Sequence, residues 1–109
     1  MALGFGEGDE AIVPAFTWIS TANVVEHLRG KVVFCDIDLE TFNLDVSQLA
    51  NLVSASTKVI IPVHLFGLSA DMERIKKISK GVHLVEDAAC GFGAKYNNKH
   101  VGSFGNTGC

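Results

Sequence analysis

The amino-acid sequence predicts an α/β protein built on a mainly parallel sheet with flanking helices. Short apolar runs of strand length alternate with segments in which apolar residues recur at helical spacing. Hydrophobic residues make up 48% of the 109 residues, which suits strands that are covered on both faces and therefore read as continuous apolar runs. Strands that alternate with helices imply right-handed crossover connections, and these connections make neighbouring strands parallel.

The first elements are two strands with a helix between them. Residues 10–13 form an apolar strand, and Pro14 ends it because proline lacks the N–H that a sheet ladder needs. Apolar residues recur at helical spacing over 19–28, and Gly30 supplies the stop. Residues 32–35 form the second apolar strand.

A second helix and a third strand follow. Asp45 with Gln48 resembles the N-cap pair that satisfies free backbone amides at the start of a helix. We therefore expect a short helix over 45–53. Residues 58–61 form the third strand, which Pro62 closes.

The clearest helix is predicted over 69–80. Acidic residues in its first turn and lysines in its last turn complement the helix dipole, and Gly81 follows. Residues 83–86 form the fourth strand. The glycines beyond it fit neither a dinucleotide-binding fingerprint nor a phosphate loop, so they predict a turn-rich excursion with a hairpin tip at Asn97 and Asn98.

The composition excludes several classes of protein. A net charge of −3 with nine basic residues offers no positive surface to nucleic acid or to a membrane. No run of about 18 apolar residues could span a membrane, and no leader begins at Met1, so we expect a cytoplasmic protein. Cys35, Cys90 and Cys109 form no C-x-x-C motif, so neither a disulfide framework nor a metal site is expected.

The predicted topology collects chemically active side chains on one edge of the sheet. In an open parallel sheet, ligands bind in the crevice beyond the carboxyl ends of the strands. The segments that follow the four strands carry an aromatic ring, three carboxylates, an imidazole with a second ring, and a thiol. These residues are Trp18, Asp36, Asp38, His64, Phe66, Asp87 and Cys90.

Each of these side chains also has a purely structural interpretation. Asp87 is equally well suited to begin a turn or cap a helix, and a tryptophan such as Trp18 most often packs in a core or an interface. His64 fits a hydrogen-bonded, half-buried imidazole, and Cys35 fits a small buried apolar side chain inside a strand. Cys90 is open to either interpretation because it lies at a strand exit.

A phosphatase of the haloacid dehalogenase type is one alternative function. In that class an aspartate at a strand end attacks phosphate, a second aspartate two residues later acts as an acid, and magnesium is required. Asp36 and Asp38 have this spacing, and Glu86 with Asp87 would supply a late acidic site. Against this reading, Glu40 stands where the class usually has threonine.

Five segments together carry a resemblance to a known family. They are GDEAIVPAFTWISTAN at 8–23, DIDLETFN at 36–43, IPVHLFG at 61–67, EDAA at 86–89 and VGSFG at 101–105. In this order, over nearly the whole chain, they resemble the DegT/DnrJ/EryC1/StrS family of pyridoxal-phosphate-dependent nucleotide-sugar aminotransferases.

The resemblance implies a role for three residues in binding pyridoxal 5′-phosphate. Asp87 matches the aspartate that hydrogen-bonds the pyridine nitrogen and keeps it protonated, so that the ring can accept electrons. Trp18 matches the aromatic residue that stacks on the cofactor ring. Cys90 falls where many members carry Gln or His near the phenolic oxygen, and a thiol is a weaker hydrogen-bond partner.

The resemblance also implies the fold and the reaction. Residues 1–109 would be part of the large domain of the fold-type-I pyridoxal-phosphate enzymes, which usually act as homodimers. Glutamate would donate its amino group to the cofactor, and the amino group would pass to a keto sugar carried on a nucleotide diphosphate.

The resemblance places two parts of the site outside this chain. The lysine that forms a Schiff base with the cofactor is expected beyond Cys109, and the loop that holds the cofactor phosphate is expected before Met1. The chain would then contain no catalytic residue, and we expect no transaminase activity from it alone. The remaining alternative is a truncated sheet module without catalytic activity.

Overall fold

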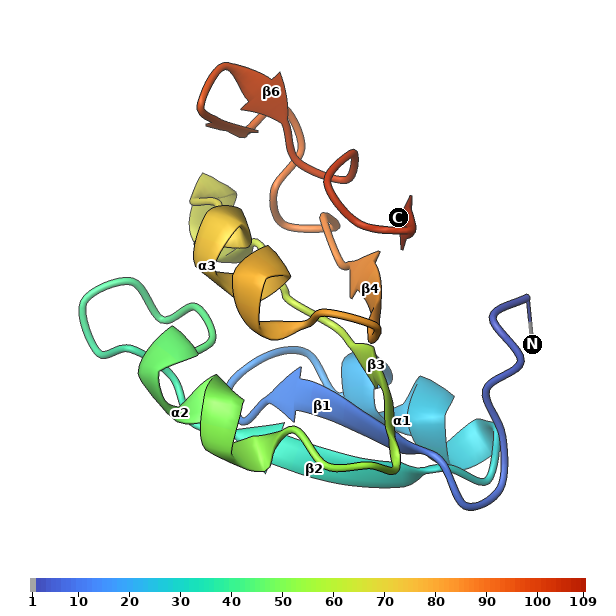
Figure 1. Cartoon of the computed structure of the whole chain (residues 1–109). Coiled ribbons are helices and arrows are strands. Elements are labelled where there is room, and N and C mark those ends of the chain that lie inside the picture. The colour runs from blue at the N-terminus through green and yellow to red at the C-terminus, as the bar shows by residue number, and fades with distance from the viewer. Residues whose placement is uncertain (1) are drawn as a thin grey trace.

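The computed structural model describes residues 2–109, and the prediction about a leader at Met1 lies outside them. Figure 1 shows a sheet with helices packed against it and a small hairpin near the C-terminus. The elements are β1 (Glu10–Pro14), α1 (Ser20–His27), β2 (Lys31–Cys35), α2 (Val46–Leu52), β3 (Thr57–Ile60), the 3₁₀ helix η1 (Leu65–Gly67), α3 (Met72–Ile78), β4 (His83–Glu86), β5 (Lys95–Tyr96), β6 (Lys99–His100) and β7 (Thr107–Gly108).

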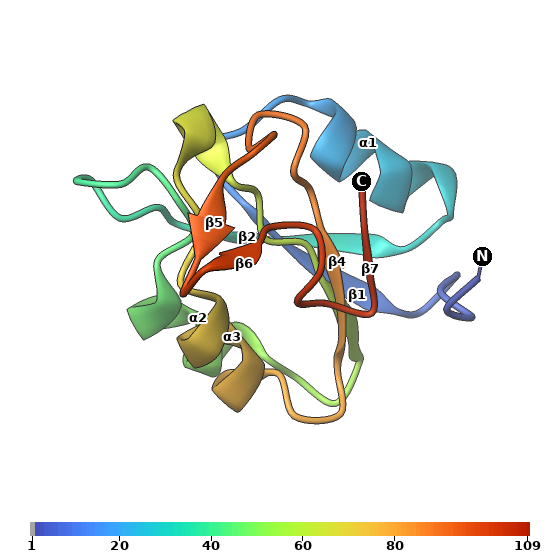
Figure 2. The same ribbon diagram turned by 90° about the horizontal axis from the view of Figure 1, so that it is seen from above.

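The main sheet has the strand order β2-β1-β3-β4-β7, and every neighbouring pair in it is parallel. Helix α1 covers one face of this sheet, and α2 and α3 cover the other, as Figure 2 shows from above. The predicted α/β fold class with its parallel sheet and flanking helices is therefore confirmed. The order also puts β1 and β3 inside the sheet, with β2 at one edge.

Strand β1 shows why the strands read as unbroken apolar runs. Successive side chains on a strand point to opposite faces. Ile12 belongs to the apolar cluster beneath α2 and α3, whereas Ala11 and Val13 belong to the cluster beneath α1. All three side chains are fully buried. Both faces of β1 are core from Ala11 to Val13, and its one charged residue, Glu10, stands at the start of the strand, where it pairs with Lys31.

All three predicted helices are present at the predicted positions, but the third is shorter than predicted. The Asp45 carboxylate caps α2 by accepting hydrogen bonds from the amide of Ser47 and the side chain of Gln48. The helix predicted over 69–80 is shorter, because Asp71 stands before it as its N-cap and accepts from the amide of Arg74. No helix within residues 2–109 is long and apolar enough to cross a membrane.

Two elements were not predicted. Strand β7 pairs with β4 because Asn106, just before β7, makes two hydrogen bonds to Leu84. The amide of Leu84 donates to the side-chain oxygen of Asn106, and the amide of Asn106 donates to the carbonyl oxygen of Leu84. Gly105 permits this approach: a Cβ atom there would lie 2.6 Å from the Leu84 carbonyl oxygen. The short helix η1 depends on Phe66 at a φ of +54°. The predicted hairpin is present, and Asn97 and Asn98 have the positive φ angles of a two-residue turn between β5 and β6.

Cys35 confirms its structural interpretation as a buried apolar side chain. It lies in β2 with no exposed surface, and its thiol donates to the carbonyl oxygen of Asp45 at 3.5 Å. Burial, reinforced by the negative charges of Asp45 and Asp36, raises the pKa of the Cys35 thiol from 9.0 to about 11. The folded chain therefore holds this proton more tightly than the unfolded chain.

We predict that Cys35 makes the stability of the fold fall at alkaline pH. The contribution is fully present below pH 9.0 and is lost as the pH rises toward about 11, because only the unfolded thiol ionises readily in that window. The loss amounts to roughly 2–3 kcal/mol. Urea unfolding from pH 7 to 11 should show a shallower decline for Cys35→Ala than for the wild type. The matched control Cys90→Ala alters an exposed thiol and should keep the wild-type slope, and equal slopes for all three proteins would contradict the prediction.

Candidate site at the carboxyl ends of the strands

Asp87 is the first residue beyond β4 and joins the sheet to α1. Its Oδ2 atom accepts a hydrogen bond from the Thr21 hydroxyl at 3.0 Å, and its Oδ1 atom accepts one from the amide of Ala89 at 3.2 Å. The side chain is half-buried. Asp87 thus begins a turn, as its structural interpretation predicted, and it also faces a neighbouring element. A carboxylate has about four acceptor sites, so further donors can still bind it.

Thr21 was missed by the sequence analysis. It lies in the first turn of α1 with only 4% of its surface exposed, and its amide donates to the carbonyl oxygen of Trp18 at 3.2 Å. Trp18 is 77% exposed, so it does not pack in the core of this chain. The hydroxyl bond therefore places the loop that carries Trp18 at the same edge of the sheet as Asp87. The signal in the sequence was a polar residue on the buried face of α1.

His64 does not join Asp87 at this edge. Its backbone amide donates to the Asp87 carbonyl oxygen, but its imidazole has no exposed surface and lies 3.1 Å from Glu86. The imidazole Nδ1 atom accepts a hydrogen bond from the amide of Ala70 at 3.1 Å. The prediction of a hydrogen-bonded structural imidazole is confirmed, but the imidazole is fully buried rather than half-buried. The predicted position of the His64 side chain in the crevice is wrong.

The chain after β4 lies close to the chain after β3. The carbonyl oxygen of Cys90 accepts from the amide of Gly67 at 2.9 Å, while the Cys90 side chain is exposed. A Cβ atom at Gly91 would lie 2.7 Å from the Cβ atom of His64, so only glycine fits here without a shift. At the neighbouring strand end, burial and the charge of Asp87 raise the pKa of the Cys109 thiol.

Three aromatic rings from three loops meet at this edge, although the sequence analysis singled out only Phe66 among them. The ring centroids of Phe16 and Phe42 lie 5.5 Å apart, and those of Phe42 and Phe66 lie 6.2 Å apart. Phe42 and Phe66 both have positive φ angles, which bulky residues rarely adopt and which concentrate at functional sites. The rings hold the loops after β1, β2 and β3 together.

Asp36 and Asp38 follow β2, at the edge of the sheet. One oxygen of Asp38 accepts from the amides of Glu40 and Thr41 and from the Thr41 hydroxyl, and these bonds, chiefly those from Thr41, lower the pKa of the Asp38 carboxyl. Asp38 therefore caps a turn. Two strands, β1 and β3, separate this pair from Glu86 and Asp87, so the acidic residues required by the phosphatase alternative are not gathered.

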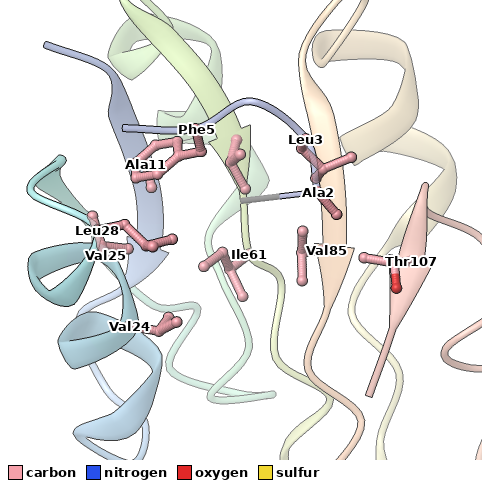
Figure 3. Close-up of a pocket in the computed structure, with 11 residues that line it drawn as sticks. Ala2, Leu3, Phe5, Ala11, Val24, Val25, Leu28, Ile61, Val85 and Thr107 are labelled. Carbon is pink, nitrogen blue, oxygen red and sulfur yellow. The ribbon is translucent and has the colours of Figure 1, made fainter. Parts of the chain in front are cut away.

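Two of the cavities formed by the described residues lie beside the sheet or at its edge. One, of about 410 Å³, adjoins the exit of β4 and is lined by small residues, among them Ala88, Gly102 and Cys109. The other, of about 200 Å³, is apolar and lies on the face covered by α1 (Figure 3). Figure 3 shows Val25 on α1 and Val85 on β4 turned into this second cavity. Asp87, Trp18 and Cys90 line neither of the two.

Comparison with known proteins decides the family. The profile described as the DegT/DnrJ/EryC1/StrS aminotransferase family matches residues 1–109. The chain belongs to this family. The resemblance carried by the five sequence motifs is therefore confirmed, and the family favours an aminotransferase over a phosphatase.

Curated relatives match nearly the whole chain. This chain is 51% identical to a pleiotropic regulatory protein of Geobacillus stearothermophilus. The aligned 106 residues cover 95% of this chain and 28% of that protein. The chain is 42% identical to the GDP-perosamine synthase of Escherichia coli O157:H7, over 96% of the chain and 29% of that protein. The chain thus spans a little over a quarter of the length of these relatives.

Solved structures of the family share the fold. A DegT/DnrJ/EryC1/StrS aminotransferase from Brucella abortus superposes with a TM-score of 0.95 at 39% identity, over 99% of the chain and 31% of that structure. The E. coli GDP-4-keto-6-deoxy-D-mannose-3-dehydratase with bound hydrated PLP superposes with a TM-score of 0.87 at 40% identity. This match covers 91% of the present chain and 26% of the dehydratase. The predicted fold-type-I architecture is confirmed by these neighbours.

We predict that Thr21→Val, which keeps the shape of the side chain but removes its hydroxyl, lowers the free energy of unfolding by about 0.5–1.5 kcal/mol. The cause is the loss of the 3.0 Å hydrogen bond to Asp87, and urea unfolding measures it. In an Asp87→Asn background, Thr21→Val should lower the free energy of unfolding by a smaller amount, because the charged acceptor of the Thr21 hydroxyl is already gone. Ser20→Ala removes the neighbouring exposed hydroxyl as a control. An equal loss in Ser20→Ala, or no loss in Thr21→Val, would contradict the assignment.

Proposed function

We propose that residues 1–109 form part of the cofactor-binding large domain of a pyridoxal-phosphate-dependent aminotransferase. The reaction is the transfer of an amino group from glutamate to a keto sugar linked to a nucleotide diphosphate. The observation that carries the proposal is Asp87, a half-buried carboxylate held at the exit of β4 by Thr21. The names of the relatives, among them GDP-perosamine synthase, support the class of substrate.

The residues present fit the cofactor. Each oxygen of Asp87 accepts one hydrogen bond within the chain, which leaves acceptor capacity for the protonated nitrogen of a pyridine ring. The exposed ring of Trp18 offers a flat apolar face on the same edge. The small residues after Asp87 let a flat group approach closely. The exposed thiol of Cys90 is our third proposed contact, near the phenolic oxygen.

Each residue then has a defined task. Pyridoxal phosphate, when bound, supplies the electron sink for breaking a C–H bond. Asp87 holds a proton on the ring nitrogen, and Thr21 fixes the direction in which the Asp87 carboxylate points. Trp18 covers the ring and keeps water from one side of it. We further propose that glutamate is the amino donor, that the whole protein is a cytoplasmic homodimer, and that the lysine which binds the cofactor covalently lies beyond Cys109.

A second candidate reaction is dehydration of the same class of substrate. The observation that favours it is the 40% identity to the GDP-4-keto-6-deoxy-D-mannose-3-dehydratase, which nearly equals the 42% identity to GDP-perosamine synthase. Both reactions would use the same contacts to the cofactor ring. The product of the whole protein distinguishes them, since only the aminotransferase incorporates nitrogen from glutamate.

A chimera tests the proposed function. Residues of this chain replace the matching segment of E. coli O157:H7 GDP-perosamine synthase, and amination of its keto sugar by glutamate is measured. We expect the chimera to be active and Asp87→Asn to lower its kcat at least about 100-fold, which corresponds to about 2.7 kcal/mol of transition-state stabilisation. Asp36→Asn makes the same charge change at an exposed position and should leave the rate unchanged.

Two results would refute the proposal. An active chimera that keeps its rate in Asp87→Asn would remove Asp87 from the cofactor site. A folded chimera that binds no cofactor would instead support a sheet module without catalytic activity. The 109-residue chain alone, given pyridoxal phosphate and glutamate, should aminate no keto sugar.

A further inference from the structure

Glu86, the residue before Asp87, has a carboxylate with no exposed surface. One oxygen accepts hydrogen bonds from the amides of Phe104 and Gly105. The other accepts from the amide of Gly102 at 2.7 Å and lies 3.1 Å from the Nε2 atom of His64. Four N–H groups thus surround a single carboxylate. Three of them belong to a loop that otherwise has little regular structure, so the loop takes its shape from Glu86.

The imidazole of His64 can only donate to this carboxylate. Its Nδ1 atom accepts from the amide of Ala70, so Nδ1 carries no proton and Nε2 carries one. Every polar group that faces Glu86 is therefore a donor. Glutamine at this position would turn an amide NH₂ group toward one pair of these donors and could not satisfy all four of them.

Glu86 and Asp87 act on opposite sides of the sheet. Successive strand residues point to opposite faces, and the contacts agree: Glu86 meets His64 and the 102–105 loop, whereas Asp87 meets Thr21 on α1. The end of β4 is thus held from behind by Glu86 at the point where Asp87 leaves the strand. Among the described residues, Glu86 is the one buried acidic side chain, so no other buried anion is present to organise the 102–105 loop.

We propose that Glu86, with His64, is a positioning residue for Asp87. The pair fixes the exit of β4 and the 102–105 loop as one unit, so that the Asp87 carboxylate is held toward Thr21 and toward the cofactor ring. Glu86 itself touches no cofactor. The cofactor part of this inference rests on the proposed function, whereas the fixing of the β4 exit and the loop does not.

Hydrogen exchange of the backbone amides tests the anchoring directly in the 109-residue chain. Glu86→Gln should speed exchange at least about tenfold in the 102–105 loop and at the amide of Ala89, which donates to Asp87. The amide of Ala15, which pairs with Cys35 in the β1–β2 part of the sheet, should keep its wild-type rate. Glu40→Gln removes the same charge from an exposed position and should change none of these rates.

Two results in this experiment would overturn the inference. Unchanged exchange in the loop and at Ala89 would mean that Glu86 holds neither. Equal acceleration at Ala15 would mean that Glu86 contributes only to global stability. Should Glu86→Gln fail to fold, Glu86→Asp keeps the charge but shortens its reach by one methylene group, and the same local acceleration is expected from it.

Binding of pyridoxamine 5′-phosphate to the cofactor-free chimera, which includes the segments expected to hold the cofactor phosphate, tests the link to Asp87. This probe lacks an aldehyde, so it does not react with surface lysines. Glu86→Gln and Asp87→Asn should each weaken binding about tenfold or more, and the double variant should bind no more weakly than Asp87→Asn alone. If the fold-losses of affinity in the two single variants multiply in the double variant, the two residues act independently and the positioning role is overturned. If the chimera without these substitutions binds no probe, the proposed cofactor contact of this chain fails, while the exchange rates still decide whether Glu86 anchors Asp87.

Discussion

The burial of one negative charge organises the functional edge of this sheet. A carboxylate taken out of water is very costly unless donors replace its hydration, and Glu86 obtains its donors from two separate parts of the chain. His64 comes from the segment after β3, and three amides come from the 102–105 loop. Satisfying this charge therefore draws both segments to the end of β4. Strand β7 then pairs alongside β4, with Gly105 allowing the close approach to Leu84.

The strands and most helices could be predicted because local patterns determine them. An unbroken apolar run such as β1 must be covered on both faces, and Asp45 caps α2 through its neighbours in sequence. Strand β7 could not be predicted in this way. Thr107 and Gly108 carry no apolar pattern, and they become a strand only because Asn106 supplies hydrogen bonds to Leu84 across 22 residues of chain.

The candidate site shows the same division between local and distant causes. The position of Asp87 at a strand exit follows from the sequence, but its partner Thr21 is 66 residues away. The sequence placed His64 on the functional edge, yet its imidazole turns toward Glu86, because a buried carboxylate recruits any donor within reach. A glutamate at the end of an apolar strand was the available signal. Charged residues are almost never fully buried unless they are paired, so Glu86 implied a partner that the sequence did not name.

The adjacent carboxylates of Glu86, the last residue of β4, and Asp87, the first residue after it, meet two requirements that one residue could not meet. Glu86 is satisfied entirely by this chain and serves the scaffold, while Asp87 keeps acceptor capacity and faces outward. A site of this kind suits chemistry shared by many enzymes rather than selection of one substrate. The relatives agree with this: a synthase of GDP-perosamine and a sugar dehydratase match the chain almost equally, at 42% and 40% identity. Overall identity in this segment therefore does not separate these two relatives, and under the proposed function the choice of reaction falls to residues that act on the substrate rather than on the cofactor ring.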